Sequence, residues 1–183
     1  MATGAEPLVV WINGAFGVGK TAVAEELIEL LPGAIVFDAE PHGDLLRRAL
    51  PPAEQPDDFQ DLPAWRELTR AVVASIARTR GGVVVVPMTV VDDTYFDEMV
   101  GGLRRDGIPL LHMSLVASPQ VVTARLRARP GSNDWAFDRV ERCVAALAGA
   151  QFAEHLDASV ATPAQLAQHI RARVTDRRAG ASS

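Results

Sequence analysis

The chain has 183 residues, a usual length for one compact α/β domain, and residues 1–183 are expected to form a single domain with a sizeable core. Hydrophobic residues make up 48% of the chain and charged residues 22%, a composition that excludes the disordered and collagen-like classes. The formal net charge of -5 lacks the excess of cations that nucleic-acid binding usually needs, so no nucleic-acid partner is expected.

Neither export nor membrane insertion is expected. The N-terminal apolar stretch stops at Asn13, too early for a signal peptide, and the other long apolar run, residues 82–91, is about half of what a membrane span requires. The single cysteine, Cys143, cannot form an internal disulfide and belongs to no metal-binding spacing. These features predict a cytoplasmic protein without a membrane span.

Strands and helices are expected to alternate along the chain. Short apolar runs predict strands at residues 8–12, 34–37, 83–86, 110–116 and, more weakly, 155–161. Apolar residues at helical spacing predict helices at residues 23–31, 44–50, 65–80, 96–106, 118–129, 137–147 and 162–175. Residues 176–183, rich in Arg, Ala, Gly and Ser, are expected to be frayed. The alternation predicts an α/β fold of three layers, with a parallel sheet between helices.

One motif carries the chemistry. Between the first predicted strand and helix, the pattern G-x-x-x-x-G-K-[ST] is matched by Gly14, Ala15, Phe16, Gly17, Val18, Gly19, Lys20 and Thr21. In such a P-loop, backbone N–H groups surround a phosphate, the lysine reaches the β- and γ-phosphates, and the threonine can bind Mg²⁺. Lys20 is also the only lysine in the chain. The motif predicts ATP and Mg²⁺ as cofactors.

The rest of the chain narrows the class of P-loop protein. A GTPase reads guanine with an N-K-x-D segment, which is impossible here because the only lysine lies in the P-loop. Small phosphotransferases have about this length, a carboxylate after the second strand and an arginine-bearing lid. By analogy to P-loop kinases, we expect a five-stranded parallel sheet with strand order 2-3-1-4-5.

Asp38, followed by Glu40, comes directly after the second predicted strand and opens on the same sheet edge as the P-loop. A carboxylate there can deprotonate an acceptor hydroxyl or hold Mg²⁺ through water. The alternative is that Asp38 only caps a helix or faces solvent. Asp92 and Asp93 are further candidates for holding Mg²⁺ through water.

Three arginines flank the polar break at residues 130–134. Arg125, Arg129 and Arg142 can close over the transferred phosphoryl group and neutralise its charge. Together with Lys20 and Asp38 they form the predicted catalytic set. Each arginine alone is equally well explained as a surface residue of a helix.

Aromatic and soft apolar side chains are expected near the acceptor, where they suit a uracil ring or a lipid-bearing ligand. Core packing is the better explanation for Trp65 and Phe96, which begin apolar helix faces, and Tyr95 belongs to the same group. The predicted substrate-binding set comprises Asp38, Glu40, Phe59, Trp65, Arg66, Met88 and Thr89.

The chain resembles the tunicamycin-resistance proteins over most of its length. The resemblance rests on Trp11-Ile12-Asn13 directly before the P-loop, on Val86-Pro87-Met88-Thr89, and on residues 138–143 around Glu141-Arg142-Cys143. It implies nucleotide binding, phosphorylation of a small molecule and protection from a nucleoside antibiotic. The third strand, however, ends in Pro87-Met88-Thr89 without the acidic residue that many P-loop enzymes place there.

Three hypotheses follow. The first is an ATP- and Mg²⁺-dependent phosphotransferase that acts on a hydroxyl of a small nucleoside-type antibiotic and confers resistance. The second is a nucleoside or metabolite kinase. The third is a nucleotide-dependent protein that sequesters the antibiotic without chemistry. A nucleoside monophosphate is disfavoured as acceptor because the loop at residues 51–63 carries four carboxylates and no cation, unless Arg47, Arg48 and Arg66 line the pocket.

Overall fold

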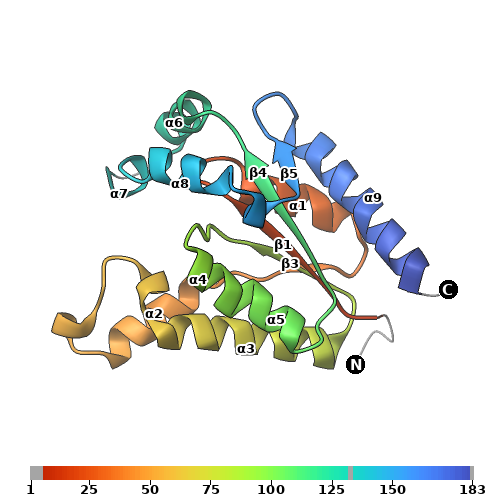
Figure 1. Cartoon of the computed structure of the whole chain (residues 1–183), viewed down its shortest axis with the longest axis horizontal. Coiled ribbons are helices and arrows are strands. Elements are labelled where there is room, and N and C mark those ends of the chain that lie inside the picture. The colour runs from red at the N-terminus through yellow and green to blue at the C-terminus, as the bar shows by residue number, and fades with distance from the viewer. Residues whose placement is uncertain (1–5, 132–133, 182–183) are drawn as a thin grey trace.

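The computed structural model describes residues 6–131 and 134–181, and its centre is a five-stranded parallel sheet (Figure 1). The strand order is β2-β3-β1-β4-β5, as predicted. The strands are β1 (Leu8–Gly14), β2 (Ile35–Val36), β3 (Val83–Pro87), β4 (Leu110–Val116) and β5 (His155–Asp157). The α/β fold inferred from the alternation of strands and helices is confirmed.

β1 occupies the middle of the sheet. All seven of its residues are buried, because β3 and β4 pair with it on both sides and helices cover both faces. Trp11 pairs with Val86 of β3 and with His112 of β4. A strand buried on both faces is apolar at successive positions instead of alternating between apolar and polar residues. For this reason the apolar run in the sequence predicted the strand.

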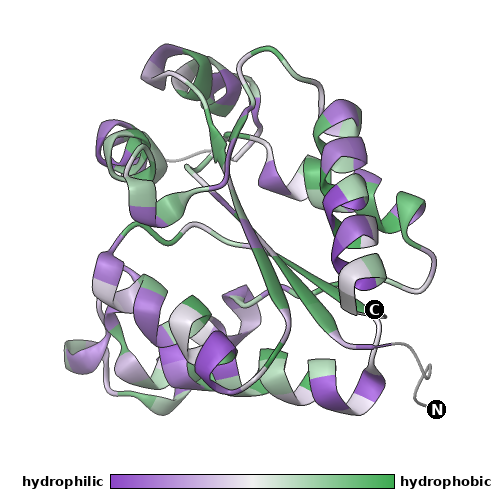
Figure 2. Ribbon diagram, turned by 45° about the vertical axis from the view of Figure 1, so that its right-hand side comes forward, coloured by the Kyte–Doolittle hydropathy of each residue, from purple (hydrophilic) through white to green (hydrophobic). Residues whose placement is uncertain are grey.

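Helices form the outer layers (Figure 1). They are α1 (Lys20–Leu30), α2 (Glu40–Ala49), α3 (Pro63–Arg80), α4 (Asp93–Phe96), α5 (Gly102–Arg105), α6 (Pro119–Ala128), α7 (Asp134–Phe137), α8 (Val140–Leu147) and α9 (Pro163–Ala181). α1 packs against α9, and α3 packs against α5. Figure 2 shows apolar strands at the centre and helices whose hydrophilic residues face outward.

Short turns complete the chain. A π-helical turn, η3 (Asp97–Gly101), joins α4 to α5, so the single helix expected at residues 96–106 is built from three segments. The loop expected at residues 51–63 contains two 3₁₀ turns, η1 (Pro52–Glu54) and η2 (Phe59–Asp61). A further 3₁₀ turn, η4 (Ala150–Phe152), precedes β5.

Two helix boundaries differ from expectation by four residues or more. α2 begins at Glu40, because Pro41 fits the first turn of a helix, whereas the sequence predicted a start at residue 44. α9 continues to Ala181, past the predicted end at residue 175, since Arg and Ala are good helix formers. The expected break at residues 130–134 includes residues 132 and 133, which lie outside the described residues, as do 182 and 183.

Within residues 6–131 and 134–181, no helix combines the length and the apolar character needed to cross a membrane.

Candidate functional site

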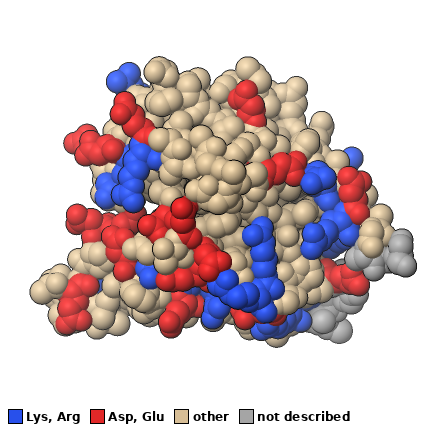
Figure 3. Space-filling view, viewed as in Figure 1, with Lys and Arg blue, Asp and Glu red and all other residues tan. Residues whose placement is uncertain are grey.

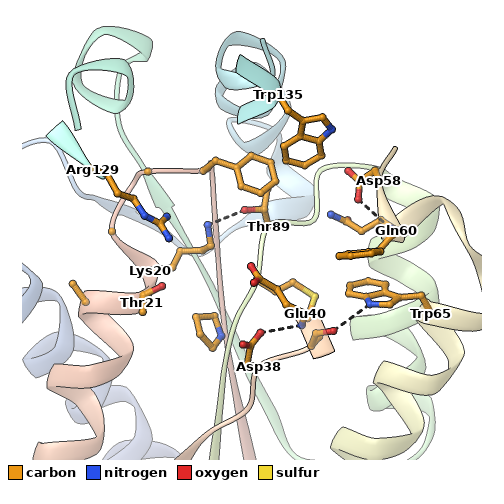
Figure 4. A pocket seen from close by; sticks show the side chains of 18 of the residues that line it. Lys20, Thr21, Asp38, Glu40, Asp58, Gln60, Trp65, Thr89, Arg129 and Trp135 are labelled. Carbon is orange, nitrogen blue, oxygen red and sulfur yellow. Dashed lines mark hydrogen bonds between the residues drawn. The ribbon is translucent and has the colours of Figure 1, made fainter. Parts of the chain in front are cut away.

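A cleft of about 850 Å³ opens at the carboxyl ends of the strands (Figure 4). The P-loop forms its floor, and its walls come from the start of α2, the turn η2, the segment after β3 and the end of α6. Topology explains the position, because the carboxyl ends of parallel strands and the loops that follow them share one edge of the sheet.

The glycines of the P-loop are required by its backbone. Gly17 has a φ of +81°, and a Cβ there would lie 2.6 Å from Cγ of Leu126, so α6 packs directly on the loop. Gly19 has a φ of +113°, and a Cβ there would meet nothing within 4 Å. The loop is therefore tightly packed beneath Gly17 and open above Gly19, which fits a phosphate approaching the backbone N–H groups.

Lys20 reaches back over the P-loop. Its Nζ donates hydrogen bonds to the carbonyl oxygens of Gly14 at 2.9 Å and Ala15 at 3.0 Å, and to Oγ1 of Thr89 at 2.8 Å. Burial lowers the pKa of this ammonium from 10.5 to about 7, and the nearby Arg129 acts in the same direction. A bound phosphate would favour the charged ammonium and raise the pKa of Lys20 again.

Two polar residues organise the floor of the cleft. Oγ1 of Thr89 donates to the Gly14 carbonyl at 2.8 Å, so the segment after β3 contacts the P-loop where many P-loop enzymes have a carboxylate. The buried Asn13 accepts from the N–H groups of Gly14 at 2.8 Å and Val90 at 2.9 Å. The role of Asn13 was not predicted, although a polar residue ending an apolar strand was a usable signal.

Asp38 and Glu40 both line the cleft and are exposed. Oδ1 of Asp38 accepts from the backbone N–H of Glu40 at 2.9 Å. Asp38 therefore makes a local contact at the start of the helix and also lines the cleft. Between them, the Ala39 carbonyl accepts from Nε1 of Trp65 at 3.2 Å, which ties this segment to α3. Thr21, the predicted Mg²⁺ ligand, lines the same cleft.

The other two candidate carboxylates lie elsewhere. Asp92 caps α4, with its Oδ1 accepting from the N–H groups of Thr94 at 2.9 Å and Tyr95 at 3.0 Å. Asp93 accepts from Gln151 at 2.8 Å. Neither belongs to the lining of the cleft, so of the four predicted carboxylates only Asp38 and Glu40 line it.

Two of the three predicted lid arginines line the cleft, and the third does not. Arg125 lines the cleft and donates to the carbonyl oxygens of Val18 at 2.9 Å and Ala158 at 2.8 Å. Arg129 also lines the cleft and extends toward Lys20 (Figure 4). Arg142 is exposed on α8 and is not among the residues that line the cleft.

The predicted acceptor residues divide in a similar way. Phe59, Trp65, Met88 and Thr89 line the cleft, although Trp65 is only 4% exposed and also serves the core. Tyr95 and Phe96 lie outside the lining, and Phe96 is buried against His112 and Phe152.

Arg66 is placed outside the cleft lining, contrary to the expectation that it contacts the acceptor. It is 7% exposed, its Nε donates to Glu98 at 2.5 Å, and its guanidinium stacks on Tyr95 at 4.0 Å. It also donates to the Gln60 carbonyl. Arg66 therefore holds the turn η2 in place instead of pointing into the cleft.

Trp135 of α7 lines the cleft and was not predicted. Its ring meets Phe16 of the P-loop edge to face, with 5.0 Å between centroids, and the guanidinium of Arg139 lies 3.9 Å from its centroid. A tryptophan directly after a polar break was the available signal. Opposite it lies Asp58, which caps the turn η2 (Figure 4). Burial raises the pKa of the Asp58 carboxyl, and the nearby Arg139 and Arg142 act in the other direction.

Comparisons with known proteins give the chain a family and a fold. Residues 9–155 match the family described as AAA domain. The structure is similar to the tunicamycin resistance protein of Deinococcus radiodurans, with a TM-score of 0.78 and 32% identity over 91% of this chain and 95% of that chain. No curated protein matches the chain.

Two further solved structures share the fold. A sugar kinase from a Janibacter species has a TM-score of 0.69 and 18% identity over 93% of this chain and 95% of that chain. A gluconokinase from Sinorhizobium meliloti has a TM-score of 0.67 and 18% identity over 98% of this chain and 99% of that chain. The chain thus has the fold of P-loop kinases.

Proposed function

Because this chain belongs to the tunicamycin-resistance family, within the P-loop proteins of the AAA-domain group, we propose that it is a phosphotransferase that confers antibiotic resistance. It transfers the γ-phosphoryl group of ATP to a hydroxyl of a small nucleoside-type antibiotic. The observation that carries this proposal is the placement of the Lys20 ammonium and the Asp38 carboxylate in one cleft. The protein acts in the cytoplasm, as its cysteine usage predicts.

The P-loop residues fit a nucleotide with Mg²⁺. Within the part of the chain that the structure describes, no group of three His, Cys, Asp or Glu side chains can hold a metal ion. Mg²⁺ in kinases is usually held by only one or two protein groups together with the phosphates, and Thr21 directly and Asp38 through water would serve here. When bound, Mg²⁺ neutralises charge on the β- and γ-phosphates.

The reaction follows from these positions. The acceptor oxygen attacks the γ-phosphorus, the bond from that phosphorus to the β–γ bridging oxygen breaks, and ADP leaves. Asp38 takes the hydroxyl proton as general base. Lys20 stabilises charge on the β- and γ-phosphates, and Arg129, which extends toward Lys20, adds a second cation at the phosphate end of the cleft. Arg125 supports the P-loop through the Val18 carbonyl.

Antibiotic sequestration without chemistry is a second candidate function. The observation that favours it is Thr89, which lies in the segment after β3 where no carboxylate is present and which forms a hydrogen bond with Lys20. A protein of this kind would use ATP only to order the cleft around the drug. A nucleoside or metabolite kinase is the third candidate, and the kinase-like fold is compatible with it.

Phosphorus NMR tests the proposal. The whole protein is mixed with ATP, Mg²⁺ and tunicamycin, and we expect ADP together with a new phosphomonoester signal that is absent with Lys20→Ala. Growth of a sensitive host on tunicamycin should improve with the wild type and not with Lys20→Ala. Protection without ADP or a new signal would establish sequestration, whereas turnover of other hydroxylated metabolites alone would establish a metabolite kinase.

A further inference from the structure

Asn13 is a fully buried polar residue near the end of β1, and it is not among the residues that line the cleft. The backbone pairing of β1 with β3 ends one residue earlier. Ile12 lies opposite Pro87 in the register, and its carbonyl accepts from the N–H of Met88 at 3.0 Å. Beyond this point β1 pairs with β4 alone, where Asn13 lies opposite Ser114. Any further link between β1 and the segment after β3 must therefore be made by a side chain.

The side-chain amide of Asn13 makes this link. Its Oδ1 accepts from the backbone N–H of Val90 at 2.9 Å, and its Nδ2 donates to the Val90 carbonyl at 2.8 Å. The amide thus pairs with both backbone groups of one residue, as a neighbouring strand would. Oδ1 also accepts from the N–H of Gly14, the first residue of the P-loop, at 2.8 Å. An ionised carboxylate could accept from the two N–H groups, but it would turn an oxygen instead of a donor toward the Val90 carbonyl.

Thr89 continues the link from Val90 to the lysine. It directly precedes Val90 and is buried, and its Oγ1 donates to the Gly14 carbonyl and accepts from Nζ of Lys20, each at 2.8 Å. A hydroxyl can donate and accept at once, whereas an ionised carboxylate could not donate to the carbonyl. The contacts therefore close a ring from Asn13 through Val90, Thr89 and Gly14 back to Asn13. The ammonium of Lys20 is bound to two members of this ring, Thr89 and Gly14.

The orientation of this ammonium matters because carboxylates line the same cleft. They are Asp38, Glu40, Asp57 and Asp58, and Figure 3 shows acidic side chains gathered on the side of the molecule where α2 lies. Negative charge on that side opposes the approach of a triphosphate. A triphosphate therefore gains affinity when the Lys20 ammonium is already directed at the P-loop and is not free to turn toward the carboxylates.

We propose that Asn13 is a positioning residue of the nucleotide site. Through Val90 and Thr89 it holds the ammonium of Lys20 over the P-loop before a phosphate binds. The flexible lysine side chain then loses less conformational freedom when ATP binds, so the link raises the affinity for ATP. This inference rests on the binding of ATP that the proposed function includes, and it holds with or without phosphotransfer.

Ser114 provides a matched control for a purely structural role. It lies opposite Asn13 in the register and is equally buried, and its Oγ donates to the Phe152 carbonyl at 2.7 Å. Each of the two side chains ties a strand to a backbone carbonyl, but that of Ser114 reaches η4 instead of the segment beside Lys20. Ser114→Ala should therefore lower the free energy of unfolding and change the affinity for ATP by less than about twofold.

Calorimetric titration of the whole protein with Mg²⁺ and a non-hydrolysable ATP analogue tests the inference. Asn13→Ser keeps a hydroxyl beside Gly14, but its side chain ends one bond too early to reach Val90. We expect this variant to bind the analogue about tenfold more weakly than the wild type, and Thr89→Val to show a similar loss. The double variant should also be about tenfold weaker, and not a hundredfold, because without the Thr89 hydroxyl nothing remains for Asn13 to hold against Lys20.

Folding of each variant is checked by circular dichroism and urea titration. If Asn13→Ser does not fold, Asn13→Thr takes its place in the same titrations. Its hydroxyl is equally short, and its β-branched side chain suits a strand and fills more of the buried space.

Three results would overturn the inference. They are additive losses in the double variant, an affinity in Asn13→Ser equal to or above that of the wild type, and the same loss of affinity in Ser114→Ala. If the wild type transfers a phosphoryl group but the losses are additive, only this inference fails. Non-additive losses without any phosphotransfer would support it and overturn only the proposed chemistry. A wild type that binds no ATP analogue would overturn both the inference and the proposed nucleotide site.

Discussion

Lys20 and Thr89 are 69 positions apart in the sequence and meet through a hydrogen bond of 2.8 Å between Nζ and Oγ1. The contact joins the P-loop after β1 to the segment after β3, and the Gly14 carbonyl accepts from both side chains. The lysine is thus held in position before any phosphate arrives. A bound γ-phosphate would take over as partner of an ammonium that is already oriented.

Removing that ammonium should abolish nucleotide binding. Lys20→Ala is expected to show no ATP binding in calorimetry while its circular dichroism spectrum matches that of the wild type. Lys20→Arg should not restore binding, because a planar guanidinium does not fit the space of a compact ammonium. ATP affinity equal to that of the wild type in Lys20→Ala would contradict the assignment of the site.

ATP binding should be coupled to proton uptake. Burial lowers the pKa of Lys20 to about 7, so at pH 8 most of the free protein carries a neutral amine, while a bound phosphate favours the ammonium. Binding at pH 8 should therefore take up close to one proton and weaken as the pH rises further, whereas binding at pH 6 should take up little from this group. Calorimetry in buffers of different ionisation enthalpy measures the uptake, and the same uptake at both pH values would argue against a lowered pKa.

The general base is tested at Asp38. Asp38→Asn should lower the turnover number by roughly 10² to 10⁴ with little change in ATP affinity, the range expected for loss of a general base. Steady-state kinetics with the phosphorylated antibiotic as product gives both values. If the variant keeps full turnover, the general base is instead Glu40, which lines the cleft two residues further along the chain.

Two glycines with nearly equal φ values allow the cost of backbone strain to be measured separately from the cost of a side-chain collision. Gly17 has a φ of +81° and Gly33 a φ of +80°, but only at Gly17 would a Cβ collide with Leu126. Gly33→Ala should cost about 1–2 kcal/mol in the free energy of unfolding, from the left-handed backbone alone. Gly17→Ala should cost more and also weaken ATP binding, as urea titrations and calorimetry would show. Equal costs would mean that Leu126 moves aside freely.

Arg66 is expected to act on the acceptor through the turn η2. Arg66→Met should weaken acceptor binding several-fold and leave ATP affinity unchanged, because it frees the Gln60 carbonyl and the Glu98 carboxylate without touching the P-loop. Arg70→Met is the control on the same helix, since Arg70 forms a longer ion pair with the exposed Asp106, at 3.9 Å, and packs on Gly102 of α5. Equal effects of the two variants on acceptor binding would exclude a positioning role for Arg66.

Local patterns predicted most of the fold and the P-loop. The buried strands are continuous apolar runs, and the glycines and lysine of the motif are adjacent in the sequence, so no tertiary information was needed. The contacts of Arg66 were different, because its partner Glu98 lies 32 positions away on the turn that joins α4 to α5. Nothing in the sequence around Arg66 distinguishes an arginine that points into a cleft from one that pairs behind it.

Trp135 and Asn13 show the same limit at the site itself. The ring of Trp135 reaches the cleft because α7 brings it against Phe16 of the P-loop, a contact fixed by the packing of distant segments. Asn13 was visible as a polar residue, but its bond to Val90 depends on the pairing of β1 with β3. In both cases the residue type could be read from the sequence, but the residue that it contacts could not.

The two hydrogen bonds of Arg125 set a lower limit on how short a working version of this protein can be. The family match ends at residue 155, three positions before Ala158, whose carbonyl shares the Arg125 guanidinium with the Val18 carbonyl of the P-loop. A fragment trimmed to the matched region would leave one half of that guanidinium without its acceptor, next to the nucleotide site, and would remove α9, against which α1 packs. We therefore expect a fragment that folds and binds nucleotide on its own to extend beyond residue 155.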